Sequence, residues 1–90
     1  METHAIITTV TAIVDSVRNL DPAYEVERVC VHRAGGGFVL VNRGTHCPFP
    51  EAPFVTWEFT RHGAFLHTGH YNMDEQGGND DFIERARRGY

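Results

Sequence analysis

Three histidines stand close together in the stretch HGAFLHTGHYN, at positions 62–72. His62, His67 and His70 have side chains that can bind metal ions or act as general acids and bases, because an unperturbed imidazole titrates at about pH 6.5. The stretch has the pattern of a β-strand, in which residues three apart face opposite sides. We therefore expect that His67 and His70 do not hold one ion together.

Two cysteines enlarge the set of possible metal ligands. Cys30 and His32 share one face of a predicted strand, and His46 and Cys47 are adjacent in a predicted loop. Structural zinc sites use four Cys or His ligands, usually in closely spaced pairs such as C-x2-C, and no such spacing occurs here. The sequence thus predicts two free thiols, no metal site and no cofactor, although a small metal-binding protein stays open as an alternative.

Motifs for catalysis are also missing from the sequence. There is no G-x-S-x-G motif, and the glycine-rich run at 34–37 precedes a strand. Phosphate groups bind instead where such a run opens a helix. Cysteines and histidines occur, but no recognised spacing pairs them as nucleophile and base. The sequence therefore predicts a protein that is not an enzyme.

The hydrophobic pattern predicts the elements that must position these residues. A period of 3.6 residues predicts an amphipathic helix over residues 4–20, which Pro22 ends. Alternating β-branched and aromatic residues predict strands at 24–33, 37–43, 54–60 and 64–72. A second helix is predicted at 79–89, with Asn79 as its N-cap and Gly89 as the residue that follows its end.

This order predicts one α+β domain over residues 1–90, with the sequence of elements α-β-β-β-β-α. We expect a four-stranded antiparallel sheet covered by helices on one face. The core beneath the Ile6–Leu20 helix should contain Val29, Val31, Val39, Val41, Val55, Trp57 and Phe59. The other side of the third strand, with Thr56, Glu58 and Thr60, should face water. In the fourth strand one side should carry Phe65, His67, Gly69 and Tyr71, and the other Leu66, Thr68, His70 and Asn72.

Charge and hydropathy exclude some classes of function. The formal charge is −4, from eight basic and twelve acidic residues, whereas a generic nucleic-acid binder shows a basic patch or stripe. No apolar run is long enough to span a membrane, and the N-terminal segment lacks the basic region of a signal peptide. We expect a cytoplasmic protein without a membrane partner.

Two features could contact a partner. The loop at 42–53 contains three prolines, and ordered loops of this length are often functional. Phe49 lies in it between two prolines, and the solvation cost of a lone exposed Phe favours its packing back onto the core. Otherwise Phe49 is an anchor for a partner, as is Tyr71 at the edge of a strand.

Acidic residues cluster near the C-terminus. Five of them fall within eleven residues that contain no basic side chain, namely Asp74, Glu75, Asp80, Asp81 and Glu84. A solvated helix start accounts for them, because acids stabilise helix N-termini. The functional alternative is a binding patch for a basic protein surface.

The segment FVTWEF…GAFLHTGHYNMDEQGGNDDFIERAR, about a third of the chain, resembles a segment of small accessory proteins of phages and plasmids. The shared features are the W-x-F strand Trp57–Glu58–Phe59, the G-x-Y strand Gly69–His70–Tyr71 and the D-F-x-x-R helix Asp81–Phe82–Ile83–Glu84–Arg85. The resemblance implies a mobile-element origin and a role as an inhibitor that binds host defence systems, including CRISPR systems. It carries over no catalytic residue.

The sequence therefore predicts an anti-CRISPR-like protein-binding module that acts in a bacterial host cell by covering a surface. The expected partner is a nucleic-acid-handling host complex with a basic surface, and a homodimer stays open. The candidate binding residues are Phe49, Tyr71, Asp74, Glu75, Asp80, Asp81 and Glu84. The alternative is a nucleic-acid-binding accessory protein that uses the arginines on or beside the strands, Arg28, Arg33, Arg43 and Arg61.

Overall fold

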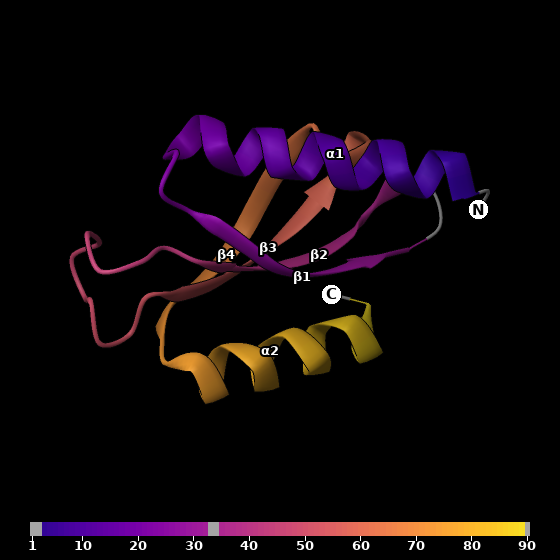
Figure 1. Ribbon diagram of the computed structural model, residues 1–90. Helices are drawn as coiled ribbons and strands as arrows, with labels where there is room; N and C mark the ends of the chain where they lie inside the picture. Colours follow the sequence, from indigo (N-terminus) through magenta and orange to yellow (C-terminus); the bar gives the residue numbers. More distant parts are fainter. Residues whose placement is uncertain (1–2, 33–34, 90) are drawn as a thin grey trace.

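A computed structural model describes residues 3–32 and 35–89 of the chain, which form one antiparallel sheet and two α-helices (Figure 1). The elements are α1 (Thr3–Leu20), β1 (Glu25–Val31), β2 (Gly37–Asn42), β3 (Phe54–Thr60), the short 3-10 helix η2 (Arg61–Gly63), β4 (Phe65–Met73) and α2 (Glu75–Arg88). The strands lie in the order β1-β2-β3-β4, so β1 and β4 are the two edges. The predicted α+β class, element order and four-stranded antiparallel sheet are confirmed. None of the helices in the described residues is long and apolar enough to cross a membrane.

The two helices cover opposite faces of the sheet, α1 above it and α2 below it in Figure 1. The prediction that helices cover one face was therefore wrong. The reason lies in β2, where Phe38 and Leu40 alternate with Val39 and Val41 and all four side chains are buried. A central strand that is apolar on both faces must be covered on both faces.

The core is accordingly divided into two clusters. On the first face, Ile13 and Val17 of α1 pack on sheet residues that the sequence predicted as core, namely Val39, Val41, Val55, Trp57 and Phe59. Val29 and Val31 of the edge strand β1 are only partly buried against this cluster. On the second face, Phe82 of α2 packs with Phe38, Leu40 and Phe54.

Helix α2 begins earlier than the sequence predicted. Its N-cap is Asp74, whose carboxylate accepts a hydrogen bond from the backbone N–H of Gly77 at 2.7 Å, and Asn79 lies inside the helix. Two consecutive glycines favoured a loop at this point. Gly78 is nevertheless helical, and packing against the sheet favours a glycine at this position. A Cβ atom there would lie only 2.8 Å from Cβ of Phe54. The predicted end of the helix at Gly89 is confirmed, with a left-handed φ of 81°.

Strand β4 is irregular, and this changes which side chains face α2. Its pairing with β3 shifts register twice, and Thr68 and Asn72 have positive φ angles of 50° and 61°. His67 pairs with Glu58, and His70 pairs with Thr56. Because these partners are two apart in β3, His67 and His70 share the face toward α2. The predicted alternation along β4, which separated them, was wrong.

Candidate functional site

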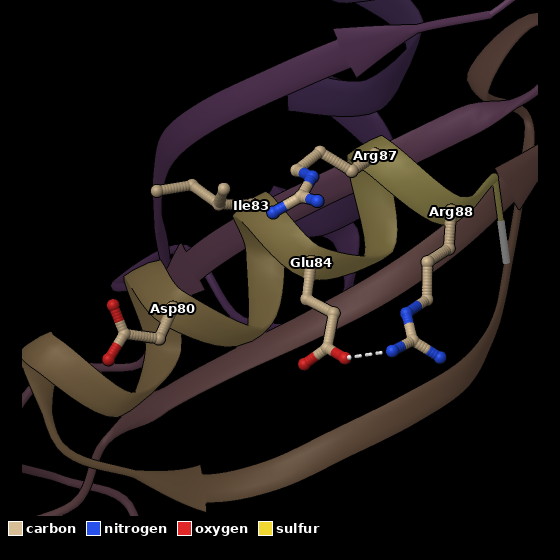
Figure 2. Close-up of a pocket in the computed structure, with 5 residues that line it drawn as sticks. All are labelled: Asp80, Ile83, Glu84, Arg87 and Arg88. Atoms are coloured by element: carbon tan, nitrogen blue, oxygen red, sulfur yellow. Dashed lines mark ion pairs between the residues drawn. The ribbon is translucent and has the colours of Figure 1, made fainter.

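The five predicted acidic binding residues do not form one free patch. Asp74 caps α2, and Asp81 is hydrogen-bonded to the sheet. Glu84 forms an ion pair with Arg88 at 3.1 Å, which leaves Glu75 and Asp80 as exposed residues for which no such contact is recorded. Figure 2 shows Asp80 and Glu84 on the outer surface of α2, followed by Arg87 and Arg88 toward its C-terminal end. The outer face of α2 is therefore mixed in charge rather than acidic.

The loop between β2 and β3 is held in place at its base. The backbone N–H of Arg43 donates to the carbonyl oxygen of Pro53 at 3.1 Å, and the guanidinium donates to the same oxygen and to Asn72. Cys47 is buried inside the loop. Phe49 is 48% exposed, so the favoured prediction that it packs back onto the core was wrong. The prolines on both sides of Phe49 restrict the backbone conformations with which it could fold inward.

Tyr71 is a fixed aromatic side chain at the edge of the sheet. Its hydroxyl accepts a hydrogen bond from Nε1 of Trp57 at 2.9 Å, and the two rings meet edge to face. The guanidinium of Arg43 lies over the Tyr71 ring, 5.6 Å from its centre. The phenol is nevertheless 51% exposed. These contacts hold the ring in one orientation while one side of it stays open to a partner.

An open groove of about 470 Å³ lies between the C-terminal half of α1 and β4, and we refer to it as the α1–β4 groove. Its larger apolar lining residues are Leu20, Trp57, Phe65, Leu66 and Tyr71. Leu20 and Phe65 are 59% and 54% exposed. Leu20 is the last residue of the predicted amphipathic helix, and in the structure its side chain is exposed rather than buried.

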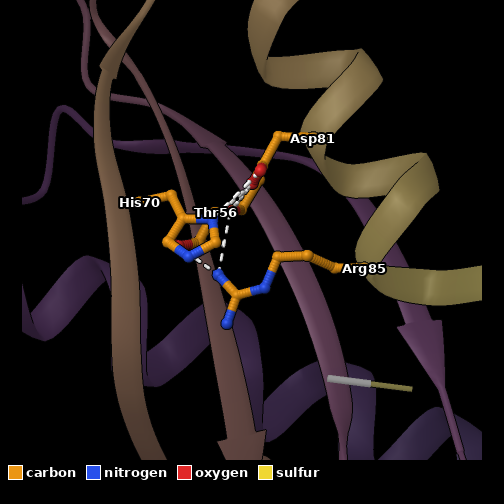
Figure 3. A network of polar contacts seen from close by, with 4 residues as sticks. All are labelled: Thr56, His70, Asp81 and Arg85. Atoms are coloured by element: carbon orange, nitrogen blue, oxygen red, sulfur yellow. Dashed lines mark hydrogen bonds and ion pairs between the residues drawn. The ribbon is translucent and has the colours of Figure 1, made fainter. Parts of the chain in front are cut away.

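A polar network connects α2 to the face of the sheet that this helix covers (Figure 3). The buried hydroxyl of Thr56 donates to the Asp81 carboxylate and accepts from Nη1 of Arg85 at 3.0 Å. Nδ1 of His70 donates to the same carboxylate, 3.0 Å from each oxygen. Thr56 was predicted to face water, but α2 covers it. The sequence likewise predicted a solvated position for Asp81, and it assigned no contact to Arg85.

Arg85 is the most unusual member of this network because it is only 3% exposed. Its guanidinium lies 5.0 Å from the centre of the Phe38 ring. Burial lowers the pKa of Arg85, and the negative charges of Asp81 and Glu58 oppose that change without reversing it. No salt bridge joins Arg85 to a carboxylate in the described part of the chain. Its Nε–H is buried and has no hydrogen-bond partner among the described residues.

A pocket of about 400 Å³ opens beside this network, and we refer to it as the β4–α2 pocket. It is lined by Glu58 of β3, His70 of β4, and Asp81, Glu84, Arg85 and Arg88 of α2. Because Nδ1 of His70 faces Asp81, its Nε2 is the ring nitrogen that remains for a further hydrogen bond. Within residues 3–32 and 35–89, His70 has no recorded hydrogen bond to a serine, threonine or cysteine side chain. The imidazole is thus oriented but lacks the adjacent nucleophile of a Ser–His or Cys–His pair.

The residues considered for metal binding are not assembled into a site. Cys30 and His32 approach each other, with Sγ 3.6 Å from Nε2. Across the described residues, no group of three or more His, Cys, Asp or Glu side chains could hold a metal ion. Cys30 and Cys47 are both free thiols, as predicted.

Among the described residues, the arginines beside the strands do not form one basic surface. Arg28 lies over the Phe82 ring and donates to Asn79, so it joins β1 to α2. Arg43 holds the loop and is buried. Arg61 is exposed in η2, and Arg33 lies outside the described residues. The two engaged side chains are therefore used in packing rather than presented to phosphate groups.

Comparisons with protein-family models, with curated proteins and with solved structures found no match to this chain. The description of the polar network therefore depends on its geometry in this structure alone. A sequence signal for part of it exists: Asp81, Phe82 and Arg85 are spaced so that all three lie on the same side of a helix. Phe82 marks that side as the one that packs on the sheet. The contribution of His70 has no such signal, because it depends on the irregularity in β4.

Proposed function

We propose that this chain is a small protein-binding module that uses the α1–β4 groove as its contact surface. The observation that carries the proposal is that Leu20, Phe65 and Tyr71, each more than half exposed, line this groove. A fully exposed aromatic side chain presents roughly 150–250 Å². The three side chains therefore expose apolar surface beside one groove, and neighbouring apolar side chains exposed together are often functional.

The groove is suited to holding one apolar side chain of a partner. Binding energy concentrates where rigid aromatic residues form a pocket, because little conformational freedom is lost there on association. Tyr71 has this character, since Trp57 and Arg43 fix its ring. Most of the affinity should therefore come from the groove, and residues around it should mainly exclude water.

The proposed partner has an apolar anchor surrounded by basic residues. The chain carries a formal charge of −4, which steers it toward positively charged surfaces and raises the association rate at low salt. The resemblance to phage and plasmid accessory proteins supports a partner of this kind, namely a bacterial defence complex that handles nucleic acid. In this proposal the chain inhibits the complex in the host cytoplasm by covering part of its surface.

The test is affinity purification from a bacterial lysate with three forms of the chain. The groove variant is Leu20→Glu/Phe65→Glu, which places charge on two exposed positions without removing core volume. The matched control is Ile83→Glu, because Ile83 is also exposed, at 44%, but lies on α2 on the other face of the sheet. We expect partners recovered with the wild type to be retained by the control and lost with the groove variant.

Two other outcomes would contradict the proposal. Recovery of the same partners with the groove variant would show that the groove is not the contact surface. An elution volume of a dimer, lost only in the groove variant, would show that a second copy of the chain occupies the groove. A Glu75→Arg/Asp80→Arg variant tests the charge separately, and we expect it to slow association and weaken the salt dependence.

A further inference from the structure

The charges around the β4–α2 pocket are unequally paired. Within the described residues, Asp81 is bound by His70, and Glu84 is bound by Arg88. Glu58 and Arg85 line the same pocket, and neither forms a salt bridge within the described part of the chain. Glu58 and Arg85 therefore face the same pocket without a direct ion pair in the described residues, although the negative charges of Asp81 and Glu58 act on Arg85 from a distance.

Arg85 is the stronger indication of a ligand. A buried charge is costly unless it is both paired and hydrogen-bonded. Only one nitrogen of this guanidinium has recorded hydrogen bonds, which Nη1 donates to the hydroxyl and carbonyl oxygens of Thr56. The buried Nε–H has no acceptor in the part of the chain that the structure describes. An arginine presents its N–H groups as a planar fork that matches the two oxygens of a carboxylate.

We propose that the β4–α2 pocket binds a small carboxylic acid that also carries a hydrogen-bond donor, as hydroxy acids and amino acids do. The ligand carboxylate accepts hydrogen bonds from Arg85 and forms the direct ion pair that this guanidinium lacks among the described residues. The hydroxyl or ammonium group of the ligand donates to Glu58, or to Nε2 of His70. That nitrogen is an acceptor in the neutral imidazole whose Nδ1–H faces Asp81.

Size and charge agree with this class of ligand. The pocket volume of about 400 Å³ lies within the range of small-molecule sites. A simple anion such as acetate would leave Glu58 unpaired and would be repelled by it, whereas a simple amine would leave Arg85 unpaired. Only a ligand that carries both a carboxylate and a hydrogen-bond donor contacts Arg85 and Glu58 at the same time.

This inference is independent of the proposed protein-binding function. The α1–β4 groove lies on the face that α1 covers, and the β4–α2 pocket lies on the face that α2 covers. Failure of one proposal therefore leaves the other unaffected.

Nuclear magnetic resonance of the arginine Nε–H groups tests the inference on the full chain. The probes are glycolate, which has a carboxylate and a hydroxyl, acetate, which lacks the hydroxyl, and glycolamide, which lacks the charge. We expect glycolate to shift the Arg85 Nε–H and the His70 ring resonances saturably at millimolar concentration, and to leave those of Arg28 unchanged. Acetate should bind at least about tenfold more weakly, which corresponds to about 1.4 kcal/mol, and glycolamide should not bind.

Matched variants localise the effect. Glu58→Gln removes the acceptor charge with little change of shape and should reduce the preference for glycolate over acetate. The control is Glu75→Gln, which changes an exposed acid in the first turn of α2 outside the pocket and should leave binding unchanged. The inference is overturned if glycolate produces no saturable shift at Arg85, if acetate binds equally well, or if Glu58→Gln and Glu75→Gln respond alike.

Discussion

His67 and His70 lie on the same face of the sheet although they are three positions apart in one strand. The cause is Thr68, which adds a residue opposite the β3 segment between Thr56 and Glu58 and adopts a φ of 50°. This bulge directs His70 toward Asp81 on α2. The polar network therefore depends on a backbone conformation that a β-branched residue rarely adopts.

Replacement of Thr68 by glycine should stabilise the protein. A non-glycine residue held at positive φ stores on the order of 1–3 kcal/mol, and glycine removes most of this while gaining freedom in the unfolded chain. We expect the free energy of unfolding in urea to rise by about 1 kcal/mol. The control is Thr60→Gly, where φ is −131° and the backbone is extended; this change should be destabilising. Equal losses in both variants would contradict the account of the bulge.

Replacement of Gly78 by alanine should destabilise the protein, although alanine is the better helix former. In an exposed helix this change gains about 1 kcal/mol. Here the new Cβ would lie 2.8 Å from Cβ of Phe54 and 3.1 Å from Cδ1 of Leu40. We expect a net loss of roughly 1–3 kcal/mol in urea unfolding, as is typical of overpacked cores.

The neighbouring glycine provides the comparison for this prediction. A Cβ at Gly77 would meet the Asp74 side chain at 3.0 Å and Met73 at 3.7 Å, but no residue of the central strands within 4 Å. Gly77→Ala should therefore change the free energy of unfolding much less than Gly78→Ala. A stabilising Gly78→Ala variant would show that α2 does not pack so closely on the sheet.

Trp57 should report unfolding through its fluorescence. Its indole is 7% exposed and donates a hydrogen bond to Tyr71, so emission should shift to longer wavelength in urea. Trp57→Ala should lower the free energy of unfolding by about 3–5 kcal/mol. Tyr71→Phe should lower it by roughly 1–3 kcal/mol, because the buried indole N–H loses its acceptor. A Tyr71→Phe variant as stable as the wild type would indicate that water replaces the phenol.

Replacement of Arg85 by methionine should separate stability from ligand binding. An apolar side chain of similar length removes the burial cost of the charge, and such replacements are often neutral or stabilising by about 1–4 kcal/mol. We expect Arg85→Met to retain or increase the free energy of unfolding and to lose the response to glycolate. A strongly destabilised variant would instead assign Arg85 to the maintenance of the fold.

The lowered pKa of Arg85 determines the direction in which the free energy of unfolding changes with pH. The folded state binds fewer protons than the unfolded state between the lowered pKa and the ordinary arginine value. The stability of the wild type relative to Arg85→Met should therefore rise with pH through that alkaline interval and stay constant below it. Urea unfolding of both proteins over a series of alkaline pH values checks this expectation.

Local pattern by itself determined the elements and most of the first core cluster. The alternation of Val55, Trp57 and Phe59 and the apolar spacing of Ile13 and Val17 in α1 are properties of neighbouring residues, and both place these side chains correctly. The same holds for the end of α2 at Gly89, where a left-handed conformation favours glycine. Such features are predictable because their energetics depend on residues within one or two turns of the chain.

Only the tertiary structure decided the placement of α2, its start at Asp74, and the polar network. The second helix lies on the far face because β2 is apolar on both sides, and its two glycines are tolerated because Gly78 packs against Phe54. His70 reaches Asp81 because the register of β4 shifts against β3. Each of these outcomes depends on contacts between segments far apart in sequence, and a pattern read along one strand or helix does not contain the geometry of its neighbour.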